Sequence, residues 1–150
     1  MNNFEEIIQF AIRHEEEEAA FYQQMAQRAD SADMKEALLV HAREEMLHKE
    51  HLEKIQANNR LPNGERRYPD CDLQIADYTT VEDRGTGTLT FEKALLLAAK
   101  REKTAQRLYQ DLANQATDPD LKKTLLFLAD QEGKHGQRLE REYDDSLTEG

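Results

Sequence analysis

Apolar residues near the start of the chain recur at the spacing of an α-helix and form one stripe, which comprises Phe4, Ile7, Ile8, Ala11 and Ile12. The same periodicity continues in three further stretches, and turn-forming residues interrupt it at 30–33 and 117–120. The pattern predicts helices over about 4–29, 32–57, 91–116 and 119–143. Because the breaks within each pair of helices are short, each pair is predicted to form an antiparallel hairpin.

The two predicted hairpins are copies of one another. When the chain is shifted by 87 residues, positions 4–54 align with 91–141 without a gap, and 17 of the 51 aligned positions are identical. The identical pairs that carry polar chemistry are Glu15/Glu102, Tyr22/Tyr109, Glu45/Glu132 and His48/His135. A Glu-x-x-His motif therefore occurs twice, in equivalent places of the two copies.

Residues 58–88 separate the copies and hold two of the three prolines and three of the six glycines, so they do not form a continuous helix. They also carry large apolar residues, unlike a solvated linker. About thirty extended residues reach roughly 100 Å at about 3.3 Å each, whereas a helix of 26 residues is about 39 Å long. The segment is predicted to be a long crossover, packed on the bundle, that joins both hairpins into one all-α four-helix domain over residues 1–150.

The predicted inner faces of the helices are interrupted by carboxylates and imidazoles. The first and third helices each place one Glu on the stripe, and the second and fourth each place a Glu-x-x-His pair there. The set is Glu15, Glu45, His48, Glu102, Glu132 and His135. Unpaired buried carboxylates are very costly, whereas two divalent cations would neutralise four of them. The sequence therefore predicts a two-metal site with the ligand set of di-iron and di-manganese bundles.

Two tyrosines extend the same faces. Tyr22 and Tyr109 lie seven residues after Glu15 and Glu102, which is two helical turns further along. Core packing alone explains these positions, and so does a hydrogen bond from each hydroxyl to a ligand carboxylate. The sequence leaves both interpretations open.

One further histidine lies close to the predicted ligands. His41 comes one turn before Glu45 on the same helical face. Its copy in the second hairpin is Leu128, so the duplication does not support a ligand at this position. We therefore interpret His41 as a core or outer-sphere histidine.

The charge and the cysteine content limit the classes of binding partner and the cellular compartment that we expect. The net charge of −11, from 31 acidic and 20 basic residues, argues against binding to nucleic acid or to an anionic membrane. A single cysteine, Cys71, excludes a disulfide within the chain and favours a reducing cytoplasm. The sequence also contains neither a run of eighteen apolar residues nor a secretory signal, so no membrane span is expected.

With these motifs in place, the chain resembles the ferritin-like superfamily and, within it, the rubrerythrin family. The resemblance rests on the paired Glu…Tyr and Glu-x-x-His segments and covers nearly all 150 residues. It implies a ferritin-like bundle that holds two iron ions, with manganese as the alternative metal. It also implies roles for the ligands: both metals are bridged by Glu45 and Glu132, one is completed by Glu15 and His48, and the other by Glu102 and His135.

The resemblance further implies reduction of hydrogen peroxide, with O₂-driven oxidation of ferrous iron as a related activity, in a homodimer. Full-length rubrerythrins carry a rubredoxin-like domain with two Cys-x-x-Cys pairs, and this sequence has none. The electron donor is therefore expected to be a separate rubredoxin-like protein or another reductant.

The sequence departs from the family at one further position. Rubrerythrins have an extra glutamate three residues after the ligand of the third helix, which exchanges with a histidine during redox cycling. Here that position is Ala105, but its copy in the first hairpin is Glu18. Two interpretations stay open: Glu18 is a redox-exchanging ligand near His135, or it is a solvated member of the acidic run at 15–18.

Three functions follow from these observations. The first is a peroxidase-type oxidoreductase that acts on hydrogen peroxide or O₂. The second is a ferroxidase or iron-binding module that sequesters iron without turnover, which requires a cage or a host compartment. The third is a purely structural bundle whose glutamates are surface charges, and it predicts no thermal shift with Fe²⁺ or Mn²⁺.

Overall fold

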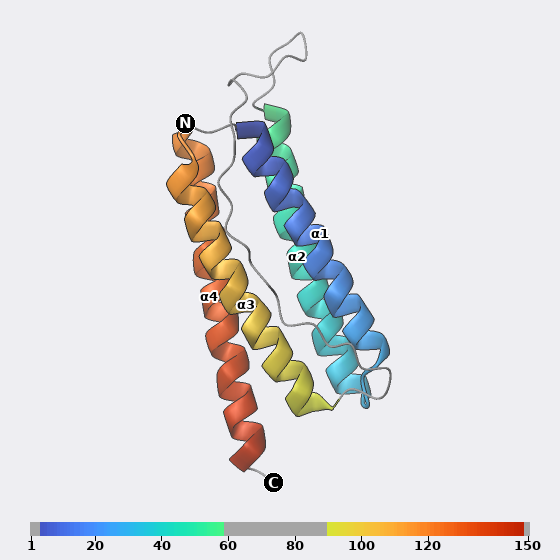
Figure 1. The fold of residues 1–150 in the computed structure, drawn as a ribbon. Helices are drawn as coiled ribbons and strands as arrows, with labels where there is room; N and C mark the ends of the chain where they lie inside the picture. Colours follow the sequence, from blue (N-terminus) through green and yellow to red (C-terminus); the bar gives the residue numbers. More distant parts are fainter. Residues whose placement is uncertain (1–3, 59–89, 149–150) are drawn as a thin grey trace.

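The computed structural model describes residues 4–58 and 90–148, with side chains up to residue 145. These residues form four helices: α1 (Phe4–Gln27), α2 (Ala32–Asn58), α3 (Phe91–Gln115) and α4 (Pro119–Thr148). The predicted fold class, an all-α bundle built from two helical hairpins, is confirmed (Figure 1). The predicted crossover lies outside the described residues except at its first residue.

The order of the helices places the two hairpins side by side. Figure 1 shows α1 and α2 antiparallel to each other, and α3 and α4 likewise. The end of α2 and the start of α3 lie at opposite ends of the bundle. As a result, α3 runs antiparallel to α1. The central parts of the four helices lie at the same level along the bundle.

Side chains cap three of the helices at their first turns. Ser31 Oγ accepts from the backbone of Met34 at 3.1 Å at the start of α2, and Thr90 Oγ1 accepts from Lys93 at 3.2 Å at the start of α3. At the start of α4, Asp118 Oδ2 accepts from the Leu121 backbone at 2.9 Å. Each cap satisfies a backbone N–H that has no partner within its helix.

The last helix is longer than the sequence pattern predicts. The apolar stripe fades near residue 143, but α4 continues to Thr148, five residues further. The added residues contain no Gly or Pro until Gly150. No helix-breaking residue therefore ends the helix where its buried stripe ends.

The core consists of two apolar clusters with a polar layer between them. One cluster takes the first residues of α1 and α4 and the last residues of α2 and α3, among them Ile7, Leu52, Leu112 and Leu125. The other takes the opposite ends, among them Met25, Met34, Leu95 and Leu139. On every helix the predicted ligands fall between these two sets. The fold therefore encloses the polar residues with apolar packing on both sides.

Two glycines in α4 face α3. A Cβ at Gly136 would lie at ordinary contact distance, 3.4 Å, from the Cβ of Glu102, and one at Gly133 would overlap the flexible end of the Gln106 side chain, 2.4 Å from its Nε2. Glycine costs about 1 kcal/mol relative to alanine inside a helix. An alanine would fit at Gly136, whereas at Gly133 the Gln106 side chain would have to move.

Candidate metal centre

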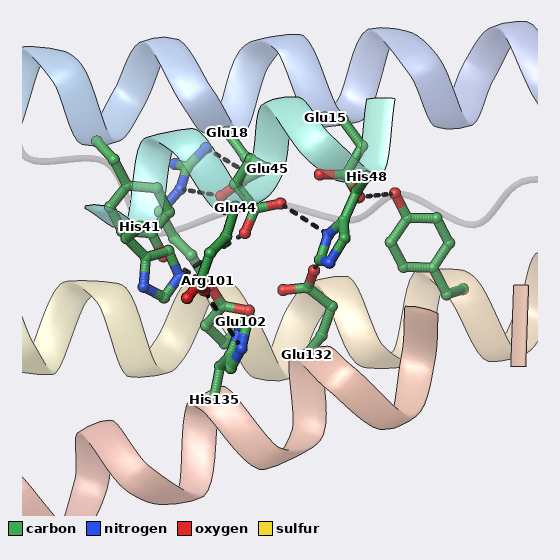
Figure 2. Close-up of polar contacts among 12 residues, drawn as sticks. Glu15, Glu18, His41, Glu44, Glu45, His48, Arg101, Glu102, Glu132 and His135 are labelled. Atoms are coloured by element: carbon green, nitrogen blue, oxygen red, sulfur yellow. Dashed lines mark hydrogen bonds and ion pairs between the residues drawn. The ribbon is translucent and has the colours of Figure 1, made fainter. Parts of the chain in front are cut away.

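The six predicted ligands converge in the polar layer, with contributions from all four helices (Figure 2). The four carboxylates are almost fully buried, at 0% exposure for Glu15, 1% for Glu45, 1% for Glu102 and 2% for Glu132. Both histidines, His48 and His135, are half-buried. The glutamates thus sit in the interior, where ionised carboxylates require positive partners.

Their donor atoms form two adjoining groups, in each of which the candidate ligand atoms lie within 4.8 Å of one another. The first group is Glu15, Glu45, His48 and Glu132, and the second is His41, Glu45, Glu102 and His135. Glu45 belongs to both groups, as a bridging carboxylate would. Glu132 belongs only to the first group, although the family resemblance implies that it bridges as well.

Within the first group the side chains surround the imidazole of His48. Its Nδ1 lies 3.4 Å from Glu132 Oε1, 3.6 Å from Glu15 Oε1 and 3.7 Å from Glu45 Oε2. These separations exceed ordinary hydrogen-bond lengths. Three carboxylates and one imidazole nitrogen therefore face one another without forming hydrogen bonds of ordinary length.

Each of the six predicted ligands has one buried donor atom without a hydrogen-bond partner among the described residues. These atoms are Glu15 Oε2, Glu45 Oε1, His48 Nδ1, Glu102 Oε2, Glu132 Oε1 and His135 Nδ1. Buried polar atoms in native proteins nearly always have partners. Six orphaned oxygen and nitrogen atoms in one layer are the donor set that a pair of cations would satisfy, so the residues fit an iron or manganese pair.

The electrostatics of the first group point the same way. Burial raises the pKa of Glu45 well above its usual range, and the neighbouring Glu15 raises this pKa further. Burial alone would lower the pKa of His48, but the carboxylates of Glu15 and Glu45 raise it to about 10. Without a metal ion, protons must supply the positive charge that these carboxylates need.

Two tyrosines hold ligand carboxylates across the bundle. The Tyr22 hydroxyl in α1 donates to Glu102 Oε1 in α3 at 3.0 Å, and the Tyr109 hydroxyl in α3 donates to Glu15 Oε1 in α1. Burial and the adjacent carboxylates raise the pKa of both hydroxyls well above their usual range, so both remain protonated donors. Each tyrosine therefore engages one oxygen of its partner and leaves the other, Oε2, facing the site.

A further carboxylate contacts His135 from α2. Glu44 Oε2 lies 3.3 Å from the Nε2 of His135, but no hydrogen bond joins the two atoms, and the Nδ1 of the same ring also has no partner among the described residues. A metal-binding histidine commonly gives its second ring nitrogen to a carboxylate, which fixes the ring. In the second copy the residue at the position of Glu44 is Gln131, so sequence repetition gave no reason to select it.

The structure tests one of the two interpretations of Glu18. The residue is buried, at 4% exposure, so it is not a solvated member of the acidic run. It also lies outside both ligand groups, because Arg101 binds both of its oxygens, at 2.6 Å from Nη2 and 3.0 Å from Nε. The guanidinium carbon lies 3.7 Å from the centroid of the Phe21 ring. Arg101 thus meets Glu18 and Phe21 in a buried ion pair between α1 and α3.

His41 is the group member that the sequence interpretation set aside. The structure places its Nε2 against Glu102 Oε1 and 3.7 Å from Glu45 Oε1. The signal that could have found it is its helical position, one turn before Glu45 on the inward face. The expectation that a ligand must occur in both copies hid that signal.

A four-helix bundle that encloses buried carboxylates and imidazoles between two apolar clusters is the architecture of ferritin-like proteins. The rubrerythrin family model matches residues 6–143, and the chain therefore belongs to the rubrerythrin family.

Two solved structures share the fold. One is a hypothetical protein from Pyrococcus furiosus, with 23% identity, a TM-score of 0.69, and coverage of 97% of this chain and 91% of that one. The other, from Thermotoga maritima, is described as a ferritin-like diiron-carboxylate protein, with 24% identity, a TM-score of 0.71, and coverage of 96% of each chain. The search of curated proteins gives no match. None of the described helices has a stretch long and apolar enough to span a bilayer.

Proposed function

We propose that this protein holds two iron ions in the polar layer and uses them as an oxidoreductase that reduces hydrogen peroxide or O₂. The observation that carries the proposal is the set of six orphaned donor atoms, one on each predicted ligand. A structural bundle offers no reason to bury four carboxylates that each keep one oxygen without a hydrogen-bond partner, because each such oxygen would weaken the fold. Membership of the rubrerythrin family agrees with iron as the metal.

The two groups assign the ligands. One ion would be held by Glu15, His48 and Glu132, the other by Glu102 and His135, and both by Glu45. Four carboxylates neutralise two divalent cations, so the loaded site carries no net charge. Nitrogen and oxygen donors suit iron and manganese, and no thiolate is present among the described residues near the site.

The bound ferrous ions would each supply one electron, and two electrons with two protons reduce one hydrogen peroxide to two water molecules. The chain supplies the surroundings of this reaction. Tyr22 and Tyr109 orient Glu102 and Glu15 through hydrogen bonds. The apolar clusters above and below the layer restrict water. A separate rubredoxin-like protein or another reductant would return the electrons.

Anaerobic loading with Fe²⁺, followed by a pulse of hydrogen peroxide in a stopped-flow spectrometer, tests the proposal. We expect fast oxidation of two irons per chain, and repeated turnover when a reductant is supplied. Glu45→Ala, which removes the shared carboxylate, is expected to abolish this oxidation. Glu17→Ala, at an exposed position of α1, is the matched control and should behave as wild type.

The same experiment separates the remaining functions. Oxidation of bound iron without any turnover in the presence of reductant would favour the ferroxidase or sequestration function. That function also requires assembly into a cage or loading into a host compartment. Absence of iron binding, with no rise in melting temperature on adding Fe²⁺ or Mn²⁺, would leave only the structural bundle.

A further inference from the structure

The two ligand groups are not chemically equivalent. The group around His48 contains three carboxylates and one imidazole, whereas the group around His135 contains two carboxylates and two imidazoles. The extra imidazole is His41. Two residues make the groups differ: Glu132 belongs only to the first, and His41 belongs only to the second. Of these two, His41 is the one that has no place in the duplicated six-ligand pattern.

His41 is built into the second group rather than lying at its edge. It is buried, with 6% exposure, and its Nε2 faces the carboxylates of Glu102 and Glu45. Its ring packs on Tyr22, with centroids 4.2 Å apart, and lies 5.3 Å from the ring of His135. Figure 2 shows His41 and His135 approaching the carboxylates from α2 and α4 respectively.

The equivalent place in the other group is apolar. The copy of His41 is Leu128, which is fully buried and belongs to one of the two apolar clusters. No imidazole can therefore reach the Glu15–His48 position from the corresponding turn of α4. The asymmetry follows directly from the sequence and does not depend on small shifts of side chains.

His41 Nε2 forms a hydrogen bond with Glu102 Oε1, which also accepts one from Tyr22 at 3.0 Å; a carboxylate oxygen can accept both. Glu102 Oε2 and His135 Nδ1, in the same ligand group as His41, have no hydrogen-bond partner among the described residues. The hydrogen bond of His41 therefore leaves two donor atoms of this group unsatisfied. A cation bound among these atoms would replace the close contact between His41 and Glu102, and it would accept a lone pair from each of the two side chains.

We propose that His41 is an additional metal ligand, confined to the position of Glu102 and His135, so that the two metal positions differ in affinity and selectivity. Imidazole favours Fe²⁺, Co²⁺ and Zn²⁺, whereas carboxylates suit Mn²⁺. The position with His41 therefore takes up the first equivalent of Co²⁺, and the carboxylate-rich position fills second. The inference rests on the proposed binding of metal ions, but not on the proposed reaction.

X-ray absorption at the cobalt edge tests this directly, because it counts the imidazoles bound to the metal. The sample is metal-free protein to which one equivalent of Co²⁺ is added. We expect two imidazoles per cobalt in the wild type, from His41 and His135, and one in His41→Leu. His51→Leu, at an exposed position of the same helix, is the matched control and should keep both.

Affinity supplies the second readout. Loss of an outer-sphere partner weakens metal binding about 10- to 100-fold, so loss of a ligand should weaken Co²⁺ binding at the position of Glu102 and His135 by about 100-fold or more. The affinity of the other position should stay unchanged. His41→Gln keeps a hydrogen-bond donor for Glu102 but has no imidazole. This variant also tests the inference if His41→Leu fails to fold. We expect it to lose one imidazole and the affinity of the first step.

The outcomes distinguish the two proposals. Protein that binds no Co²⁺ contradicts both the proposed function and the role of His41. Protein that binds two Co²⁺ ions, with one imidazole on the first, supports the metal centre and overturns the inference. The inference also fails if His41→Gln keeps the wild-type spectrum and affinity, because His41 would then act only as a hydrogen-bond partner.

Discussion

Removing the carboxylate of Glu18 should destabilise the metal-free protein strongly, because it leaves the guanidinium of Arg101 buried without a partner. The two side chains are 5% and 8% exposed, so water cannot replace the lost contact without a rearrangement. Breaking a buried ion pair in this way costs about 3–5 kcal/mol. Since the free energy of unfolding of a domain is only about 5–15 kcal/mol, Glu18→Ala should remove a large share of it.

The assays are unfolding by guanidinium chloride and unfolding by heat, both followed by circular dichroism in the presence of a chelator. At about 2–4 °C per kcal/mol for a chain of this size, the loss corresponds to a fall of roughly 6–20 °C in melting temperature. Glu17→Ala, on the exposed face of the same helix, should change stability by less than about 0.5 kcal/mol.

A double-mutant cycle isolates the pair. Arg101→Met keeps an apolar side chain over Phe21 but leaves the charge of Glu18 unpaired. The double variant removes both charges, so it should be no less stable than the weaker single variant. A cost below about 1 kcal/mol for Glu18→Ala, which is the level of a surface ion pair, would refute this account. If Glu18 is not a ligand, Glu18→Ala should also keep the wild-type stoichiometry of Co²⁺ binding.

Tyr109→Phe removes the donor to Glu15 Oε1. Leaving this acceptor unsatisfied should lower the free energy of unfolding by about 1–3 kcal/mol and weaken Co²⁺ binding about tenfold in a titration. An unchanged affinity would show that the hydroxyl does not position Glu15. The pKa of His48 is raised from 6.5 to about 10 in the metal-free protein, so its contribution to stability is fully present below about pH 6.5 and is lost as the pH rises through about 10. Because metal binding needs the neutral imidazole, calorimetry in two buffers should detect proton release near pH 8 and an affinity that increases with pH; an affinity independent of pH would contradict this. Sedimentation velocity checks the homodimer that the family resemblance implies, and a monomer would exclude it.

The fold and the convergence of the six ligands could be predicted because the same sequence pattern occurs in both copies of the repeat. Helical spacing fixes which residues share a face, and the repeat shows which polar residues on those faces belong together. Glu45 and His48 would be unremarkable alone in a chain this rich in glutamate. Their copies, Glu132 and His135, remove that ambiguity, and all four side chains meet in the polar layer.

The pairing of Glu18 could not be predicted in the same way. Its partner, Arg101, is 83 residues away in the sequence and on another helix. Whether a residue at the edge of a stripe points inward depends on the rotation of the helix, and a small rotation separates a solvated glutamate from a buried one. The sequence pattern fixes the face of a helix, but it does not fix this rotation.

The residues that escaped prediction share one place in the structure. His41 contacts Glu102, Glu44 contacts His135, and Figure 2 shows the Glu18–Arg101 pair at the same end of the polar layer. In the copies, the positions of the first three hold Leu128, Gln131 and Ala105, which carry no charge and offer no imidazole. The repeat builds a symmetric cage of six ligands, and single-copy residues then change the surroundings of one position only. A difference in chemistry between the two positions is therefore expected from several independent residues, and the loss of any one of them should reduce that difference without removing it.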